Sequence, residues 1–150
     1  MKIFATVGHT RFDSLFKQID KIQRDEWKFV SQMYDGAYTP TNGEHIAYTH
    51  EIDTYYENAD VVITHAGAGT VYNLLEMGKP IIVVANSDRI DTHQEDLIRY
   101  VEDSRFAQVC RNLDELEGLI SNVGDFVAEK YHSEPFVGAG DISKALGLID

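Results

Sequence analysis

The sequence predicts an α/β fold, with a Rossmann-like parallel sheet and helices on both of its faces. Short apolar runs alternate with longer amphipathic stretches along most of the chain, as in repeated strand–helix units. The run at 60–64 is almost continuously apolar, which is typical of a strand that is buried on both faces. The 150 residues suffice for one domain, so we expect 1–150 to form a single unit with 124–150 as a possible tail.

Each strand is expected where a short apolar run ends in glycine, proline or polar residues. The polar stretch with Gly36, Pro40 and Gly43 has the composition of a loop. Expected strands are 2–7, 27–33, 44–48, 60–64, 80–85 and 106–110.

Helices are expected where apolar residues recur at helical spacing. Gly78 followed by Pro80 gives the third helix a strong stop signal. Asn112, with Glu115 three residues later, predicts a capping box for the fifth. Phe126 and Val127 are interpreted as a continuation of that helix. Expected helices are 12–23, 51–58, 68–77, 92–102 and 113–123, with a sixth at 136–150.

Charge and cysteine content exclude several classes of function. The net charge of −12 argues against a nucleic-acid partner and against broad adhesion to an anionic bilayer. The single cysteine, Cys110, excludes an internal disulfide and is interpreted as a small buried hydrophobe. No stretch approaches the ~20 apolar residues of a membrane span, and the N-terminus resembles a strand more than a signal peptide. We therefore expect a cytoplasmic chain.

The strongest functional signal is the segment Val61 to Thr70, in which an apolar run enters a loop of small residues that opens onto a helix. Ligands of parallel sheets bind beyond the carboxyl ends of the strands, which points to the loops at 8–11, 48–53, 65–70 and 86–93. Gly67 and Gly69 allow close backbone approach, the helix start favours an anion, and Thr70 adds a hydroxyl donor. The pattern favours phosphate binding over a tight turn that needs glycine only for packing.

A dinucleotide site is a competing hypothesis. Tyr72 stands where the fingerprint places its third glycine, and Asp88 stands where a ribose-binding acid is expected. The fingerprint usually follows the first strand, and that strand here ends at Gly8. A small NAD-dependent enzyme therefore remains an alternative, as does a nucleotide-binding module without catalysis.

Other polar residues lie in the same loops. Glu76 follows Gly69 by two helical turns and is a candidate for a ribose diol, or is simply a solvated carboxylate. His93 and Gln94 open a helix and are candidates for binding hydroxyls, or belong to a polar helix start capped by Asp91 or Thr92. The first loop also opens onto a helix start that could face a pyrophosphate, unless Asp13 or Ser14 caps it. His9, His65 and His93 lack metal-ligand spacing, so no metal and no cofactor is expected.

Three motifs in this order resemble the C-terminal domain of family 28 glycosyltransferases. They are Ile-Thr-His-Ala-Gly-Ala-Gly-Thr at 63–70, Glu-Met-Gly-Lys-Pro at 76–80 and His-Gln at 93–94. The opening 4–8 and 12–15 resemble the small catalytic subunits of two-subunit transferases. That group includes the soluble subunit of the UDP-GlcNAc transferase acting on dolichol-linked GlcNAc, and E-type subunits of bacterial exopolysaccharide and capsule glycosyltransferases.

The resemblance implies the donor (C-terminal) half of a GT-B glycosyltransferase and a role for each matched residue. His65 belongs to the first motif, in which Gly67, Ala68, Gly69 and Thr70 would contact the donor diphosphate. Glu76 would hold the uridine ribose, and the uracil-binding segment matches 48–52, which ends at Ile52. The remaining matches are His9 and Thr10, facing the phosphates, and His93 and Gln94, meeting the donor sugar.

The implied activity is inverting transfer of a sugar from a UDP-sugar to a lipid-linked saccharide acceptor in surface polysaccharide synthesis. Loop and helix amides would stabilise the leaving diphosphate. A membrane-associated partner subunit would supply the acceptor site and recruit the chain to the inner face of the membrane. The catalytic base is unassigned, with His9 as the local candidate. Apolar positions of the tail would dock on that partner or pack on this domain: Phe136, Val137, Ile142, Leu146, Leu148 and Ile149.

Overall fold

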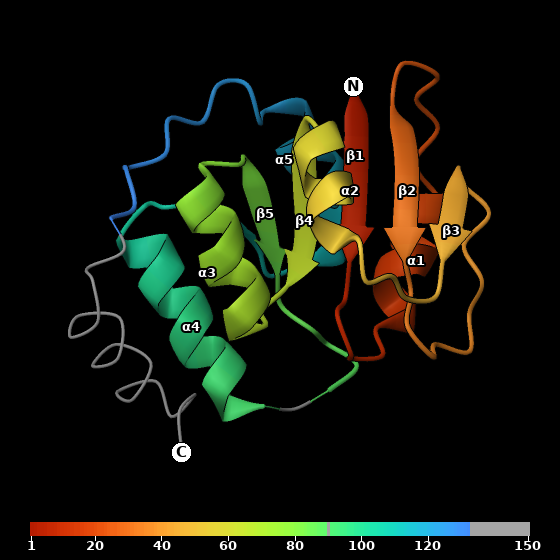
Figure 1. Cartoon of the computed structure of the whole chain (residues 1–150), viewed down its shortest axis with the longest axis horizontal. Helices are drawn as coiled ribbons and strands as arrows, with labels where there is room; N and C mark the ends of the chain where they lie inside the picture. Colours follow the sequence, from red (N-terminus) through yellow and green to blue (C-terminus); the bar gives the residue numbers. More distant parts are fainter. Residues whose placement is uncertain (90, 133–150) are drawn as a thin grey trace.

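The computed structural model describes residues 1–89 and 91–132. Its strands are β1 (Lys2–Thr6), β2 (Lys28–Gln32), β3 (Glu44–Ile46), β4 (Val61–His65), β5 (Ile81–Val84) and β6 (Gln108–Cys110). Its helices are α1 (Asp13–Asp20), α2 (Ile52–Asn58), α3 (Ala68–Met77), α4 (Thr92–Asp103) and α5 (Leu116–Ser121), with a 3₁₀ turn at Leu113–Glu115. The α/β prediction is confirmed (Figure 1).

The six strands form one sheet in the order β3-β2-β1-β4-β5-β6, and every adjacent pair is parallel. This is the strand order of a Rossmann fold, whose topological switch point lies between β1 and β4. From β1 the chain moves outward through β2 and β3, then returns to the other side of β1 for β4. The loops after β1 and β4 therefore leave the same edge of the sheet in opposite directions.

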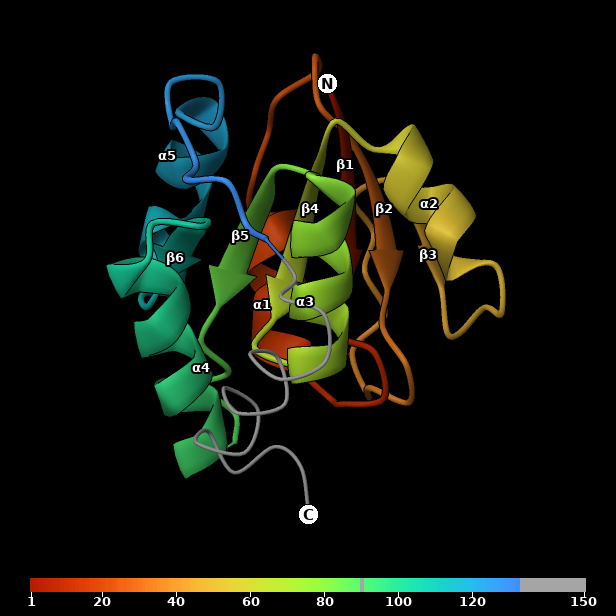
Figure 2. The same ribbon diagram turned by 60° about the vertical axis from the view of Figure 1, so that its left-hand side comes forward.

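Alternation along the central strands divides the core between two faces. Ile3 and Ala5 of β1 face the side that α1 and α5 cover, while Phe4 faces the side of α2, α3 and α4. Figures 1 and 2 show the three helices on one side of the sheet and α1 and α5 behind it. Full burial on both sides explains why β4 and β5 read as continuous apolar runs.

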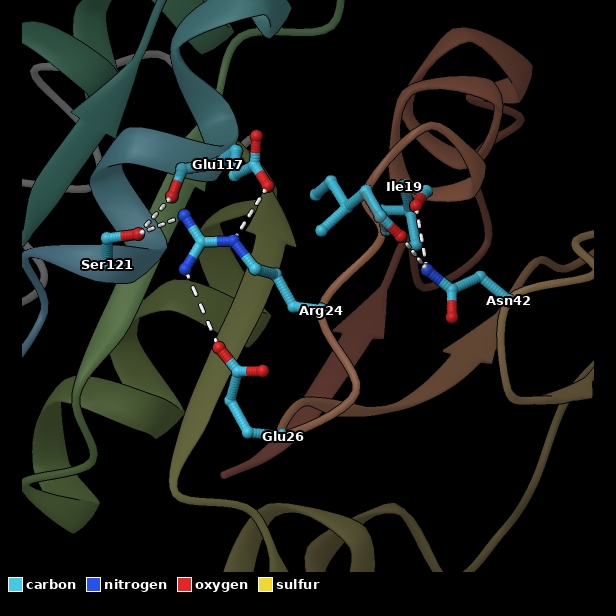
Figure 3. A network of polar contacts seen from close by, with 7 residues as sticks. Ile19, Arg24, Glu26, Asn42, Glu117 and Ser121 are labelled. Atoms are coloured by element: carbon cyan, nitrogen blue, oxygen red, sulfur yellow. Dashed lines mark hydrogen bonds and ion pairs between the residues drawn. The ribbon is translucent and has the colours of Figure 1, made fainter.

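A salt-bridge network joins the beginning of β2 to α5. The Arg24 guanidinium lies 3.1 Å from Glu117 and 3.6 Å from Glu26, and donates to the Ser121 hydroxyl at 3.5 Å (Figure 3). The same guanidinium lies 4.8 Å from the centre of the Trp27 ring. Arg24 thus covers the rim of the core where the chain turns from α1 into β2.

A second polar cluster fixes the long loop before β3 on the end of α1. The Asn42 side chain donates to the carbonyls of Ile19 and Ile22, both at 2.9 Å (Figure 3). Asp20 accepts from the Tyr38 hydroxyl at 2.5 Å and from the Asn42 amide at 2.9 Å. Burial alone would raise the pKa of Asp20, but these bonds outweigh it and lower that pKa.

Several expected helix and strand boundaries were wrong, because side-chain contacts or backbone conformations end or shorten those elements. The first helix ends at Asp20, where Asn42 takes carbonyls of the last turn, and β3 is shorter than 44–48. Asn112 caps a 3₁₀ turn by accepting from the Asp114 amide at 3.0 Å. The Glu115 amide donates to the Asn112 carbonyl at 2.9 Å, but among the described residues its side chain accepts no bond from the Asn112 amide, as a capping box requires. The last helix stops at Ser121 and does not reach Phe126. The strand expected from 106 begins at 108, because Arg105 adopts a left-handed φ of 57° before it.

The segment 124–132 crosses from α5 to the face of α3 and α4. The Glu129 amide donates to the Arg105 carbonyl at 2.8 Å, and the Tyr131 ring packs between Tyr72 and Phe106. This part of the expected docking tail therefore packs on the domain itself. The apolar positions named from 136 to 149, and the tail helix, lie outside the described residues. Within residues 1–132 the structure has no helix with the length and apolar character that a bilayer crossing requires.

Candidate functional site

The N-terminus of α3 has no side-chain cap among the described residues. Gly67 is the N-cap, in extended conformation, and no side chain caps the amides that follow. The first turn carries no acidic residue. The first amides of a helix need partners from outside the helix, and they carry a partial positive charge. The amides of Ala68, Gly69 and Thr70 are therefore free to donate to an anion at the switch point, and the phosphate site expected here stays a prediction.

Glycine occupies three positions around this loop, each for a different physical reason. A Cβ on Gly67 would lie 2.4 Å from His65 Nε2, so Gly67 makes room for the imidazole. Gly8 has a left-handed φ of 58°, and its Cβ would lie 3.2 Å from His65 Cε1. Around Gly69, by contrast, no atom of the described residues lies within 4 Å of a Cβ position. Gly69 alone faces open space, where a ligand can approach the backbone.

His65 fills the space between the two loops of the switch point. Burial, together with the positive charge of Arg89, lowers its pKa to about 4. Its Nδ1 atom is buried and has no hydrogen-bond partner among the described residues. The imidazole is therefore neutral near pH 7 and acts first as a packing residue, which holds the backbone of Gly8 and Gly67 apart.

Gln32 fixes the loop after β1. Its side-chain oxygen accepts from the amides of Val7 at 3.1 Å and Gly8 at 3.0 Å, and from the Thr6 hydroxyl at 2.6 Å. Its side-chain nitrogen donates to the carbonyls of Gly8 at 2.9 Å and Ala47 at 2.8 Å. Gln32 was not among the predicted site residues; the signal in the sequence was a pair of polar residues, Ser31 and Gln32, near the end of an expected strand.

The N-terminus of α1 is already occupied. The Asp88 carboxylate accepts from the Ser14 amide at 2.9 Å and from the Ser14 hydroxyl, and Phe12 stands at the N-cap with no side-chain hydrogen bond. Neither Asp13 nor Ser14 caps this helix through its side chain. An internal carboxylate therefore occupies the start of α1, so that of the two helices that follow β1 and β4 at the switch point, α3 has the open start.

The loop from β5 to α4 is held by its own side chains. Gln94 accepts from the Asn86 amide at 2.9 Å and donates to the Asn86 carbonyl at 3.2 Å and the Arg89 carbonyl at 3.3 Å. Asp91 caps α4 by accepting from the His93 amide at 2.9 Å, as one of the two alternatives predicted. Gln94 thus holds the loop together, and both Gln94 and His93 line a cavity.

That cavity brings residues of the first and third motifs together at the start of α3. It has a volume of about 160 Å³. A neighbouring cavity of about 440 Å³ opens between the first loop and the loop after β5. Thr10 and Arg89 line both, so the two cavities adjoin. The smaller one is lined by Thr10, His65, Ala66, Gly67, Ala68, Asn86, Arg89, Asp91, His93 and Gln94.

His9 lines the larger of these two cavities, whereas Ile52 lines neither. The His9 ring is exposed and lies 5.4 Å from the Tyr34 ring and 4.9 Å from the Tyr48 ring. Tyr34 holds a left-handed φ of 55°, which is uncommon for a bulky residue. Ile52 is the half-buried first residue of α2, in the segment that begins at Tyr48.

Glu76 is not brought to these cavities. It lies near the end of α3, about 10 Å along the axis from Gly69 at the usual helical rise. It lines a separate cavity with Phe106 and Tyr131. Asn73, one turn after Gly69, lies closer and donates to the Asp53 carboxylate of α2 at 3.4 Å. Sequence analysis did not name Asn73, although its spacing of four from Gly69 places both on one helix face.

Two remaining expectations concern the cysteine and a metal. Burial raises the pKa of the Cys110 thiol to about 11, so it behaves as a buried apolar residue. No group of three metal-ligating side chains occurs within residues 1–89 and 91–132.

Residues 3–135 match the glycosyltransferase family 28 C-terminal domain. The chain is 32% identical over 127 residues to human UDP-N-acetylglucosamine transferase subunit ALG13, covering 74% of this chain and 11% of that protein. It is 33% identical over 106 residues to the ALG13 subunit of Yarrowia lipolytica, covering 71% of this chain and 49% of that one. The chain therefore spans about a tenth of the human relative and half of the yeast one.

Solved structures show the same fold. The Acinetobacter baumannii MurG structure superposes with a TM-score of 0.67 at 16% identity, covering 99% of this chain and 52% of that chain. A solution structure of ALG13 gives a TM-score of 0.56 at 17% identity, covering 98% of this chain and 95% of that one.

Proposed function

The chain belongs to the family 28 glycosyltransferases through its C-terminal-type domain, and from that premise we propose that it is the donor-binding part of an inverting glycosyltransferase. The donor is a UDP-sugar, and the acceptor is a lipid-linked saccharide used in surface polysaccharide synthesis. The observation that carries the proposal is the uncapped start of α3 at the switch point, with open space over Gly69. A diphosphate fits that site because backbone amides suit it without a metal ion.

Residues of the loops at the switch point make the proposed contacts with the donor. The amides of Ala68, Gly69 and Thr70 bind the diphosphate, and the Thr70 hydroxyl, which lies 4.0 Å from a Cβ position on Gly8, faces the first loop. Thr10 lines the cavity beside them and His93 lines it from α4, on the sugar side. His65 and Gln94 support these loops from behind.

The ribose diol has two candidate partners on α3. Asn73 lies one turn from the diphosphate amides and is bonded to Asp53, whereas Glu76 lies two turns away near Tyr131. Uracil would lie toward Ile52, beyond that pair. Asn73→Ala and Glu76→Ala, compared for UDP and for uracil-free pyrophosphate, identify the partner, because loss of a ribose contact weakens UDP alone.

Catalysis needs a general base for the acceptor hydroxyl. His9 is exposed at the rim of the site and is the local candidate, and a base from a partner subunit is the alternative. We propose that a membrane-associated partner supplies the acceptor site and holds this chain at the cytoplasmic face of the membrane. The relatives' description as transferase subunits supports this assembly.

Calorimetric titration of the chain, alone and with a co-expressed partner, with UDP and with NAD tests the proposal. We expect UDP to bind and NAD not to, because the Asp88 carboxylate that an NAD site requires is bonded to Ser14. Absence of UDP binding at millimolar concentration under both conditions would reject the donor-site assignment.

A further inference from the structure

The start of α3 provides only about half a positive elementary charge, so a nearby cation would strengthen the binding of a diphosphate there. The chain as a whole carries a net charge of −12, which repels an anionic ligand. Four groups in the cavity lining can carry charge: Asp91, His65, His93 and Arg89. Asp91 serves as the cap of α4, and His65 is neutral near pH 7. Arg89 is the permanent cation in that lining.

The charge of Arg89 is not neutralised by a neighbouring carboxylate. Its guanidinium forms no ion pair within residues 1–89 and 91–132, whereas Arg11, at the edge of the neighbouring cavity, lies 3.3 Å from Asp35. Arg89 lines both cavities. Its charge also reaches His65, where it opposes protonation of the imidazole.

The backbone of Arg89 is fixed from both sides. Its amide donates to the Asn86 carbonyl at 3.4 Å, and its carbonyl accepts from the Gln94 side chain at 3.3 Å. The preceding residue, Asp88, is bonded to Ser14 at the start of α1. Figure 1 shows the loop after β5 running across the edge of the sheet to the loop after β1 before it returns to α4.

We propose that Arg89 is the cationic contact for the donor diphosphate, and that Asp88, bonded to α1, is the positioning residue that holds it beside the α3 N-terminus. This rests on the proposed donor site. Arg89 stabilises the negative charge that grows on the leaving diphosphate as the sugar departs. Asp88 fills the competing helix start, which leaves α3 as the place where the phosphates bind.

The test compares UDP, UMP and uridine by calorimetry on the full chain. A charge-assisted contact to the terminal phosphate predicts that Arg89→Ala weakens UDP about ten- to hundredfold, UMP less and uridine not at all. Arg89→Lys retains part of the UDP preference, because the charge remains without the bidentate geometry. Arg99→Ala is the matched control: it removes one arginine from exposed α4, where its side chain is 65% exposed.

The role of Asp88 is tested by whether its removal strengthens or weakens UDP binding. Removing a carboxylate near a phosphate site strengthens anion binding if charge alone matters, but weakens it if Asp88 positions Arg89. We expect Asp88→Ala to weaken UDP binding, with little further loss in the Asp88→Ala/Arg89→Ala double variant.

The outcomes separate the two proposals. If the wild-type chain binds UDP and Arg89→Ala keeps the wild-type preference for UDP over UMP, the role of Arg89 is refuted and the donor site stands. Tighter UDP binding by Asp88→Ala refutes the positioning role. If the wild type binds neither UDP nor UMP, the donor site fails and the role of Arg89 fails with it.

Discussion

The substitution Gly69→Ala is expected to change stability and ligand binding in opposite directions. Gly69 is the second residue of α3, and a methyl group there meets no atom within 4 Å among the described residues. Alanine restricts the unfolded chain and favours the helix, so the free energy of unfolding should rise by about 0.4–1 kcal/mol. In a domain of this size the melting temperature should rise by roughly 1–4 °C.

The same methyl group stands where a phosphate must approach the amides of Ala68, Gly69 and Thr70. If it removes two amide contacts to a charged ligand, about 3 kcal/mol of binding free energy is lost. That corresponds to about a hundredfold increase in the dissociation constant for UDP. A variant that is more stable and binds less cannot be explained by unfolding.

Gly118→Ala is the matched control. Gly118 lies within α5 on the other side of the molecule, and a Cβ there also meets no described atom within 4 Å. It should show the same gain in melting temperature with unchanged UDP affinity, measured by thermal unfolding and titration calorimetry. Wild-type UDP affinity in Gly69→Ala, or an equal loss in Gly118→Ala, would refute the reasoning.

Three further predictions concern residues that support the loops after β1 and β4. Gly67→Ala should cost about 1–3 kcal/mol in chemical denaturation, because its methyl group overlaps the His65 ring; adding His65→Ser should recover part of that loss, and no recovery would contradict the overlap. Gln32→Met should cost about 2–5 kcal/mol by urea unfolding, since the buried Val7 amide and the half-buried Gly8 amide and carbonyl lose their partners; a cost below ~1 kcal/mol would mean that water replaces them. The pKa of His65 is depressed from 6.5 to about 4 in the folded state, so its contribution to stability is complete above pH 6.5 and is lost as pH falls toward 4. His65→Asn should therefore flatten the stability–pH curve in that window, and identical curves would contradict burial of the neutral ring.

The core strands and the central helices were predictable because each carries its own signal. β4 and β5 are continuous apolar runs, and α3 ends at Gly78, whose left-handed φ of 69° suits glycine. Elements at the periphery were less predictable, because contacts distant in sequence determine their ends. Asn42 terminates α1 from more than twenty residues away, and Arg105 delays β6 through a backbone conformation that sequence periodicity does not encode.

The site was predictable where a motif implies backbone geometry and less so where it depends on side chains from other elements. The open helix start at Gly69 followed from local sequence alone. The occupation of the α1 start by Asp88 did not, because the two residues that meet are 74 positions apart. The hydrogen bonds of the Gln94 amide to the Asn86 backbone were likewise not predicted, and its expected role in donor binding stays a prediction.

We propose that UDP binds on the backbone amides at the start of α3. Amide chemical-shift mapping of the isotope-labelled chain during titration with UDP can locate that contact. We expect the largest shifts on Ala68, Gly69 and Thr70, with smaller ones in the loop of Thr10. Largest shifts at the cavity around Tyr131, or no shifts at saturating UDP, would contradict it.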